Sequence, residues 1–182
     1  MDVVEARDLA WVFIHRDARR WRHVQAAAER AEELRAAVTP EEGDLLVAAA
    51  WLHDIGYSEV LRDTGFHPLD GARYLQSAGL PRIAALVAHH SGARFVADHR
   101  GLRAELAVYV FAEDPLTDAL TYADQTAGPA GERLTVTERL ADTARRHGPT
   151  APTNLVRHVR EPYILAAAAR TEGRLRPRPN PG

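Results

Sequence analysis

A histidine and an aspartate stand side by side at positions 53 and 54, at the end of the apolar stretch AAAWLHD. The apolar residues before the pair predict a buried helix. Imidazole and carboxylate groups are costly to bury unless they have partners. A divalent metal ion supplies the counter-charge that two such groups need in a dry pocket. We therefore predict that His53 and Asp54 are metal ligands.

Further ligands have to come from other parts of the chain, where histidine and aspartate residues adjoin apolar helical stretches. Nine histidines are present, and six of them lie between His15 and His90. The chain contains no cysteine, which excludes thiolate zinc sites and cysteine nucleophiles. Histidine and carboxylate ligands suit one or two ions of Mn, Fe, Co, Ni, Zn or Mg. The residues with a suitable setting are His23, His67, His89, His90 and Asp124.

The periodicity of the apolar residues is helical along the chain, beginning with an amphipathic pattern over residues 16–38. Thr39 and Pro40 predict the start of the helix that carries His53 and Asp54 and stops at Gly56. A loop is expected over residues 56–68. Further helical patterns, mostly separated by Pro or Gly, cover residues 69–79, 81–92, 101–111, 115–128, 135–148 and 154–173. Only residues 105–111 also resemble a strand, and one short strand makes no sheet.

These patterns predict an all-α fold, a single helical bundle that forms one domain over residues 1–173. Residues 174–182 are basic and rich in Pro and Gly, so we expect a disordered tail. With 182 residues, 46% hydrophobic and 26% charged, the chain has the size and composition of one globular domain. Its apolar content is compatible with a homodimer.

The charge pattern limits the partners. The formal net charge is −2, and no basic stripe with interleaved aromatic residues is present, so we do not expect duplex nucleic acid as the main partner. No apolar run approaches the roughly 20 residues that cross a bilayer. Acidic residues precede basic ones at the N-terminus, the reverse of a secretory signal. We therefore expect a cytoplasmic protein without a membrane partner.

The order His23, His53-Asp54, Asp124 resembles the H…HD…D signature of the HD-domain metal-dependent phosphohydrolases. The stretches RWRHVQAAAERA, AAAWLHDIGY and LTYADQTAGPAGE are similar to the local motifs of that family, and the resemblance covers roughly residues 15–145. It implies an HD-type helical bundle in which these four residues bind a first metal ion. GFHPLDGARYL and VAHHSG resemble the segments that hold a second ion in some members. The resemblance then implies His67 and His89 as further ligands, with His90 as a close alternative to His89, and Asp54 bridging the two ions.

The resemblance implies a hydrolase, a phosphomonoesterase or phosphodiesterase acting on a nucleotide or another small phosphorylated metabolite. A metal-bound water at neutral pH attacks phosphorus in such a site, while cations neutralise the phosphate oxygens. Asp54 and His53 are the catalytic centre in this interpretation. Arg19 precedes His23 by one helical turn, and we expect it to contact the substrate phosphate, with Arg20 or Arg16 as alternatives.

Two other classes of function stay open. Relatives of the HD fold use two irons for oxygen-dependent cleavage of organophosphonates or of a polyol, inositol, and HDIGY and HPLDGA are similar to the phosphonate oxygenases. Those enzymes have a tyrosine and a glutamate before the first ligand histidine, whereas no tyrosine precedes Tyr57 here. A non-catalytic bundle that binds a nucleotide is the third possibility, although all core ligands are present. Each histidine considered alone is more often a hydrogen-bonded core or surface residue than a ligand.

Overall fold

Capping residues define the first helices of the computed structural model, which describes residues 1–176. Asp2 caps α1 (Val3–Ile14) by accepting from the backbone N–H of Glu5. Asp17 caps α2 (Ala18–Glu33) by accepting from two backbone N–H groups of the first turn. η1 (Arg35–Ala37) and η2 (Pro40–Glu42) then lead to α3 (Gly43–Leu52). α3 is buried on nearly every side, as its apolar sequence predicts.

The chain turns at the His-Asp pair. The helix expected to run from Pro40 to Gly56 is divided into η2, α3 and η3 (Ile55–Tyr57). α3 ends at Leu52, and Asp54 has φ −107° and ψ 5°, outside the α-helical region. Gly56 packs so closely on the next helix that a Cβ would lie 2.0 Å from the carbonyl oxygen of His67. The His-Asp pair therefore lies in a tight turn that only glycine permits at position 56.

The middle of the chain differs most from the expected pattern. α4 (His67–Ser77) and α5 (Pro81–His89) pack against each other, and η4 (His90–Gly92) follows. α6 (Ala93–His99) forms where no helix is predicted, because Val96 and Ala97 are buried there. Of the predicted helix over residues 101–111, only α7 (Arg103–Leu106) forms. Val108 and Val110 beyond it are 76% and 80% exposed, so they have no core to pack against.

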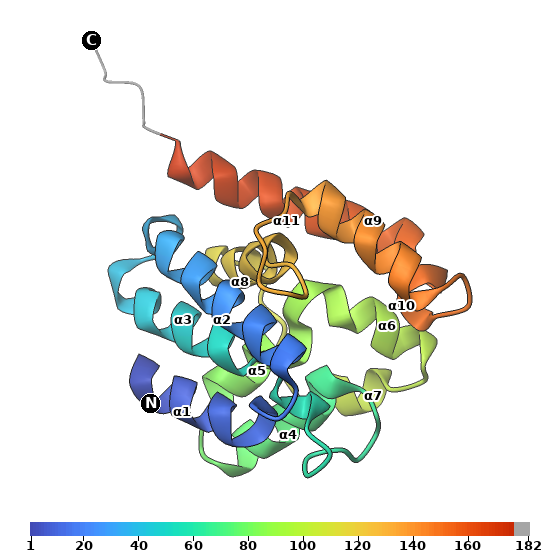
Figure 1. The fold of residues 1–182 in the computed structure, drawn as a ribbon, viewed down its shortest axis with the longest axis horizontal. Helices are drawn as coiled ribbons and strands as arrows, with labels where there is room; N and C mark the ends of the chain where they lie inside the picture. The colour runs from blue at the N-terminus through green and yellow to red at the C-terminus, as the bar shows by residue number, and fades with distance from the viewer. Residues whose placement is uncertain (177–182) are drawn as a thin grey trace.

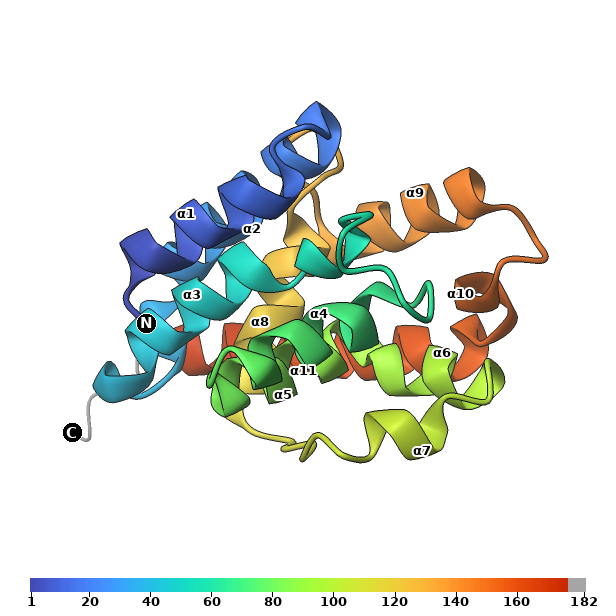
Figure 2. The same ribbon diagram turned by 90° about the horizontal axis from the view of Figure 1, so that it is seen from below.

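α8 (Pro115–Thr126) runs through the middle of the molecule and contacts α2, α3 and α11. α1, α2 and α3 gather on one side of it, and α6, α9 and α10 lie on the other (Figures 1 and 2). The last helices are α9 (Val136–His147), α10 (Pro152–Leu155) and α11 (Arg157–Leu175). Asp118 on α8 is buried and accepts from Arg170 and Arg174, which fastens α11 to α8.

The all-α prediction is confirmed, since residues 1–176 contain no strand beyond an isolated bridge between Ala127 and Arg133. α11 continues to Leu175, two residues past the predicted end of the domain, and residues 177–182 of the expected tail lie outside the described residues. Within the described part of the chain, the helices are too short or too polar to cross a membrane.

Candidate metal centre

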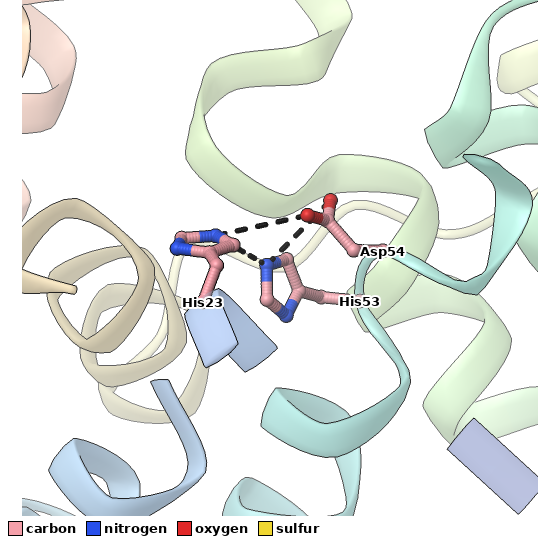
Figure 3. Close-up of side chains that lie close together, drawn as sticks. All are labelled: His23, His53 and Asp54. Atoms are coloured by element: carbon pink, nitrogen blue, oxygen red, sulfur yellow. Dashed lines mark hydrogen bonds and ion pairs between the residues drawn. The ribbon is translucent and has the colours of Figure 1, made fainter. Parts of the chain in front are cut away.

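Four side chains from three parts of the chain form a first group of potential ligands. His23 comes from α2, His53 and Asp54 from the turn after α3, and Asp124 from α8. The Nε2 atom of His23 lies 3.3 Å from Nε2 of His53, 3.1 Å from an Asp124 oxygen and 3.7 Å from an Asp54 oxygen. Figure 3 shows His23, His53 and Asp54 pointing toward one another. All four residues are at most 5% exposed.

A second group shares Asp54. His67, the first residue of α4, has its Nε2 atom 3.3 Å from Oδ1 of Asp54 and 3.3 Å from Nε2 of His90. Among residues 1–176, two groups could hold a metal ion: His23-His53-Asp54 and Asp54-His67-His90. The position of Asp54 in both is what a bridging carboxylate requires.

Hydrogen bonds to the backbone orient three of the imidazoles. The Nδ1 atoms of His23, His53 and His90 lie 3.3, 2.7 and 2.6 Å from carbonyl oxygens of Gly128, Ala50 and Val87. A carbonyl only accepts, so Nδ1 donates and Nε2 keeps its lone pair. Facing Nε2 lone pairs repel each other unless a cation lies among them. The arrangement fits a divalent metal ion with histidine and carboxylate ligands.

The charge states of the cluster also fit a metal ion. Burial acts to raise the pKa of Asp54, but Arg20 and the histidines outweigh it and hold the pKa well below its usual value. Burial acts on Asp124 in the same way, but His23, His53 and Arg139 together outweigh it, so the pKa of Asp124 is lowered as well. Burial lowers the pKa of His67 and His90. Ionised carboxylates and neutral imidazoles are the forms that bind metals.

Arg20, not Arg19, contacts the cluster. Nη1 of Arg20 lies 2.5 Å from Oδ2 of Asp54, and its guanidinium lies 3.6 Å from the centre of the Tyr57 ring. Arg19 and Arg16 are exposed. Arg19 borders only a smaller adjoining cavity of about 80 Å³. α2 directs Arg20, three positions before His23, toward Asp54, so Arg20 and not the preferred Arg19 lies beside the cluster, while the contact of either residue with a substrate stays a prediction.

His89 does not reach the cluster. Its Nε2 atom lies 2.8 Å from the carbonyl oxygen of Tyr109, and its ring packs edge-on against Phe111. α5 ends at this residue and the backbone turns into η4, so consecutive side chains point in different directions. The expectation for His89 is therefore corrected: His90, its alternative, is the histidine that lies in the second group with Asp54 and His67.

Two residues that the sequence analysis missed hold Asp124. The hydroxyl of Ser91 donates to Asp124, and Nε2 of Gln125 lies 2.8 Å from the same carboxylate. Ser91 has φ 50°, which makes it the one non-glycine residue among residues 1–176 with positive φ. Such a conformation is uncommon outside functional turns. The small residues of HHSG were the only signal for this turn in the sequence.

The centre lies in a cavity of about 340 Å³, within the range of small-molecule sites. Besides the acids Asp54 and Asp124, the cavity is lined by five arginines: Arg20, Arg100, Arg139, Arg146 and Arg160. The arginines therefore outnumber the carboxylates, and the cavity favours an anionic ligand.

Comparison with known proteins agrees with this geometry. A family model described as HD domain matches residues 20–147, which contain every potential ligand of both groups. No significant match was found among curated proteins or among solved structures. The match spans well over half of the chain, and the chain belongs to the HD-domain family.

Proposed function

We propose that the protein is a metal-dependent phosphohydrolase that cleaves a phosphate ester of a nucleotide or another small phosphorylated metabolite. The observation that carries the proposal is the convergence of histidine Nε2 atoms and carboxylates in a cavity lined by arginines. His23, His53, Asp54 and Asp124 would hold one ion, and Asp54, His67 and His90 a second. A bound divalent ion would supply hydroxide at neutral pH and neutralise charge on phosphorus oxygens.

The chain itself contributes orientation and charge. Arg20 holds the Asp54 carboxylate through Nη1, while its buried Nε has no hydrogen-bond partner among the described residues. A buried donor without a partner is costly, and a phosphate oxygen in the cavity would satisfy it. Ser91 and Gln125 fix the orientation of Asp124. Arg20 is therefore the residue that we assign to the phosphate undergoing cleavage.

The test is phosphate release from a panel of monoesters and diesters, with the stripped protein reloaded with Mn, Fe, Co, Ni, Zn or Mg in turn. We expect release that depends on the metal and that is lost in His53→Ala. Arg19→Gln is the matched control for Arg20→Gln, and only the latter should raise KM strongly. A protein that retains metal and releases no phosphate from the whole panel contradicts the proposal.

The complete six-ligand set also suits a di-iron oxygenase that cleaves an organophosphonate or a polyol. The same preparation distinguishes the two reactions. Oxygen consumption that requires iron and accompanies cleavage of a carbon–phosphorus or carbon–carbon bond would favour the oxygenase. Metal-dependent phosphate release without oxygen would favour the hydrolase.

A further inference from the structure

Two arginines of the cavity wall are not explained by the metal centre. Arg139 on α9 is 8% exposed, and its buried Nε has no hydrogen-bond partner within residues 1–176. Arg160 on α11 is half-buried, and its Nε donates to the carbonyl oxygen of Ser91 at 2.9 Å. Both line the cavity that contains Asp54 and Asp124, yet neither forms an ion pair with these two carboxylates.

The acids near these arginines do not neutralise them. The nearest carboxylate to Arg139 is that of Asp142, 3.8 Å from Nη1. Asp142 also accepts from Arg146 at 2.6 Å and from Arg145 at 3.1 Å, so one negative charge serves three guanidinium groups. In the part of the chain that the structure describes, Arg160 forms no ion pair with a carboxylate.

The two positive charges also act on each other. Burial lowers the pKa of Arg160, Asp124 acts against this, and the charge of Arg139 lowers the pKa further. Two guanidinium groups that share a low-dielectric wall repel each other unless an anion lies between them. An anionic ligand would relieve this repulsion and provide an acceptor for the buried Nε of Arg139.

We infer that Arg139 and Arg160 bind a second phosphoryl group of the substrate, separate from the phosphate that is cleaved at the metal centre. The inference rests on the proposed function and narrows its substrate class to compounds with two phosphoryl groups. The contacts distinguish the two positions: Arg20 of α2 contacts Asp54 directly, whereas Arg139 of α9 and Arg160 of α11 line the same cavity without an ion pair to Asp54 or Asp124, although Arg139 also borders the small adjoining cavity together with Arg20. Guanidinium groups suit phosphoryl oxygens because they donate in a planar fork.

The experiment compares three substrates that share a nucleoside: a 5′-monophosphate, a 5′-diphosphate and a 3′,5′-bisphosphate. The readout is the ratio of KM for each two-phosphoryl substrate to KM for the monophosphate. Arg139→Gln and Arg160→Gln should each raise this ratio at least about tenfold, since a charged contact is lost only with the second group. The 5′-diphosphate and the bisphosphate show whether the second group is adjacent to the first or remote from it.

Arg145→Gln is the control, since Arg145 is on the same helix and pairs with the same Asp142 but does not line the cavity. We expect it to leave the ratio unchanged. If both arginine variants raise KM for all three substrates equally, they serve the cleaved phosphate and the inference is wrong. If neither variant changes any KM, the arginines are structural and the inference is also wrong. If Arg139→Gln does not fold, Arg139→Lys, which keeps the charge, is measured in its place.

Calorimetry provides a readout that does not depend on turnover. The full chain, with and without chelator, should bind inorganic pyrophosphate more tightly than inorganic phosphate, and Arg139→Gln or Arg160→Gln should abolish this preference. A chain that cleaves no phosphoester but shows the preference refutes the proposed function and supports the anion site. Equal affinity for the two anions in the unsubstituted protein overturns the inference.

Discussion

Asp54 is the residue on which both ligand groups depend. Its Oδ1 atom lies 3.3 Å from Nε2 of His67, and its Oδ2 atom lies 3.7 Å from Nε2 of His23. Arg20 holds Oδ2 at 2.5 Å, which fixes the carboxylate between the groups. Oδ1 also lies 3.6 Å from Nε2 of His53, so this one carboxylate faces imidazoles of both groups.

Asp54→Asn should therefore remove both ions. The amide lacks the negative charge that each site needs, so we expect metal content below about a tenth of the unsubstituted protein and a loss of turnover of at least about a thousandfold. Elemental analysis and phosphate release measure the two effects. Asp98→Asn, which changes an exposed aspartate paired with Arg103, is the control. Retention of a full complement of metal by Asp54→Asn contradicts this assignment.

Adjacent histidines should behave in opposite ways. His90→Ala removes an imidazole from the second group and should lower the metal content. His89→Ala should leave the metal content intact but destabilise the fold by about 1–3 kcal/mol, because the Tyr109 carbonyl loses its donor. Elemental analysis and denaturant unfolding of both variants provide the comparison. Loss of metal in His89→Ala at unchanged stability would reverse the assignment.

At this scale, the sequence predicted which residue types to consider but not how each side chain points. His89 and His90 follow the same apolar helix, so only the backbone turn at η4 separates them. Likewise, Arg19 and Arg20 both lie about one turn before His23, so their positions in the sequence do not show which of them faces Asp54. The Ser91 contact with Asp124 joins residues 33 apart in the chain, and no local pattern announces it.

At the scale of the elements, the backbones of η3 and α4 approach each other closely at Gly56. A Cβ on Gly56 would meet the backbone of His67 and, at 2.6 Å, the backbone nitrogen of Gly71. Backbone atoms cannot rotate away as a flexible side chain can, so α4 would have to move. That movement would take His67 away from Asp54.

Gly56→Ala should therefore weaken the second metal site more than the first. We also expect a destabilisation of about 1–3 kcal/mol from the forced backbone shift. Gly173→Ala is the control, since Gly173 lies in α11 and a Cβ there meets no atom within 4 Å. Metal titration and thermal unfolding of the two variants test the prediction. Equal metal content and stability in Gly56→Ala would show that α4 yields without cost.

Sequence patterns predicted the presence of helices better than the residues at which they begin and end. The patterns predicted α2, α5, α8, α9 and α11, and of these α2, α8 and α9 have side-chain N-caps. The helix expected over residues 40–56 was divided, because the close contact of Gly56 with α4 is a tertiary feature. The apolar run over 105–111 suggested burial, yet Val108 and Val110 are exposed. Its hydrophobicity alone could not indicate that.

In the whole molecule, the candidate metal centre joins elements that lie far apart in the sequence, although several of them also pack on one another. Its side chains come from α2, the turn after α3, α4, η4 and α8. Without a cation, the facing imidazoles have no favourable partner for their lone pairs. Bound metal therefore favours the folded state and links these elements into one unit.

Removal of metal should lower the melting temperature. An ion present at about 100 times its Kd stabilises the fold by about 2.7 kcal/mol, which corresponds to roughly 5–10 °C for a chain of this size. Thermal unfolding with chelator, followed by addition of metal in excess, measures the shift and its recovery. An Asp54→Asn sample should show no shift with chelator. Identical curves for the unsubstituted protein with and without chelator would contradict a structural role for the ion.

The overall class of fold was accessible from the sequence because helical periodicity is repeated along the chain. The arginines that line the cavity could not be predicted from the sequence, because Arg139 and Arg160 belong to helices with many exposed basic residues. Their burial depends on how α9 and α11 pack over the cavity. A pattern within one helix does not contain that information.

Arg160 lies beyond residue 147, where the match to the HD domain ends. Of the five arginines that line the cavity, Arg160 thus lies outside the matched stretch, whereas Arg139 and the potential ligands lie within it. If Arg160 binds a second phosphoryl group as we infer, substitutions in the terminal helix would change which compound is accepted while the potential metal ligands stay in place. Evolution, or an engineer exchanging that helix between homologues, could alter substrate preference and retain the chemistry.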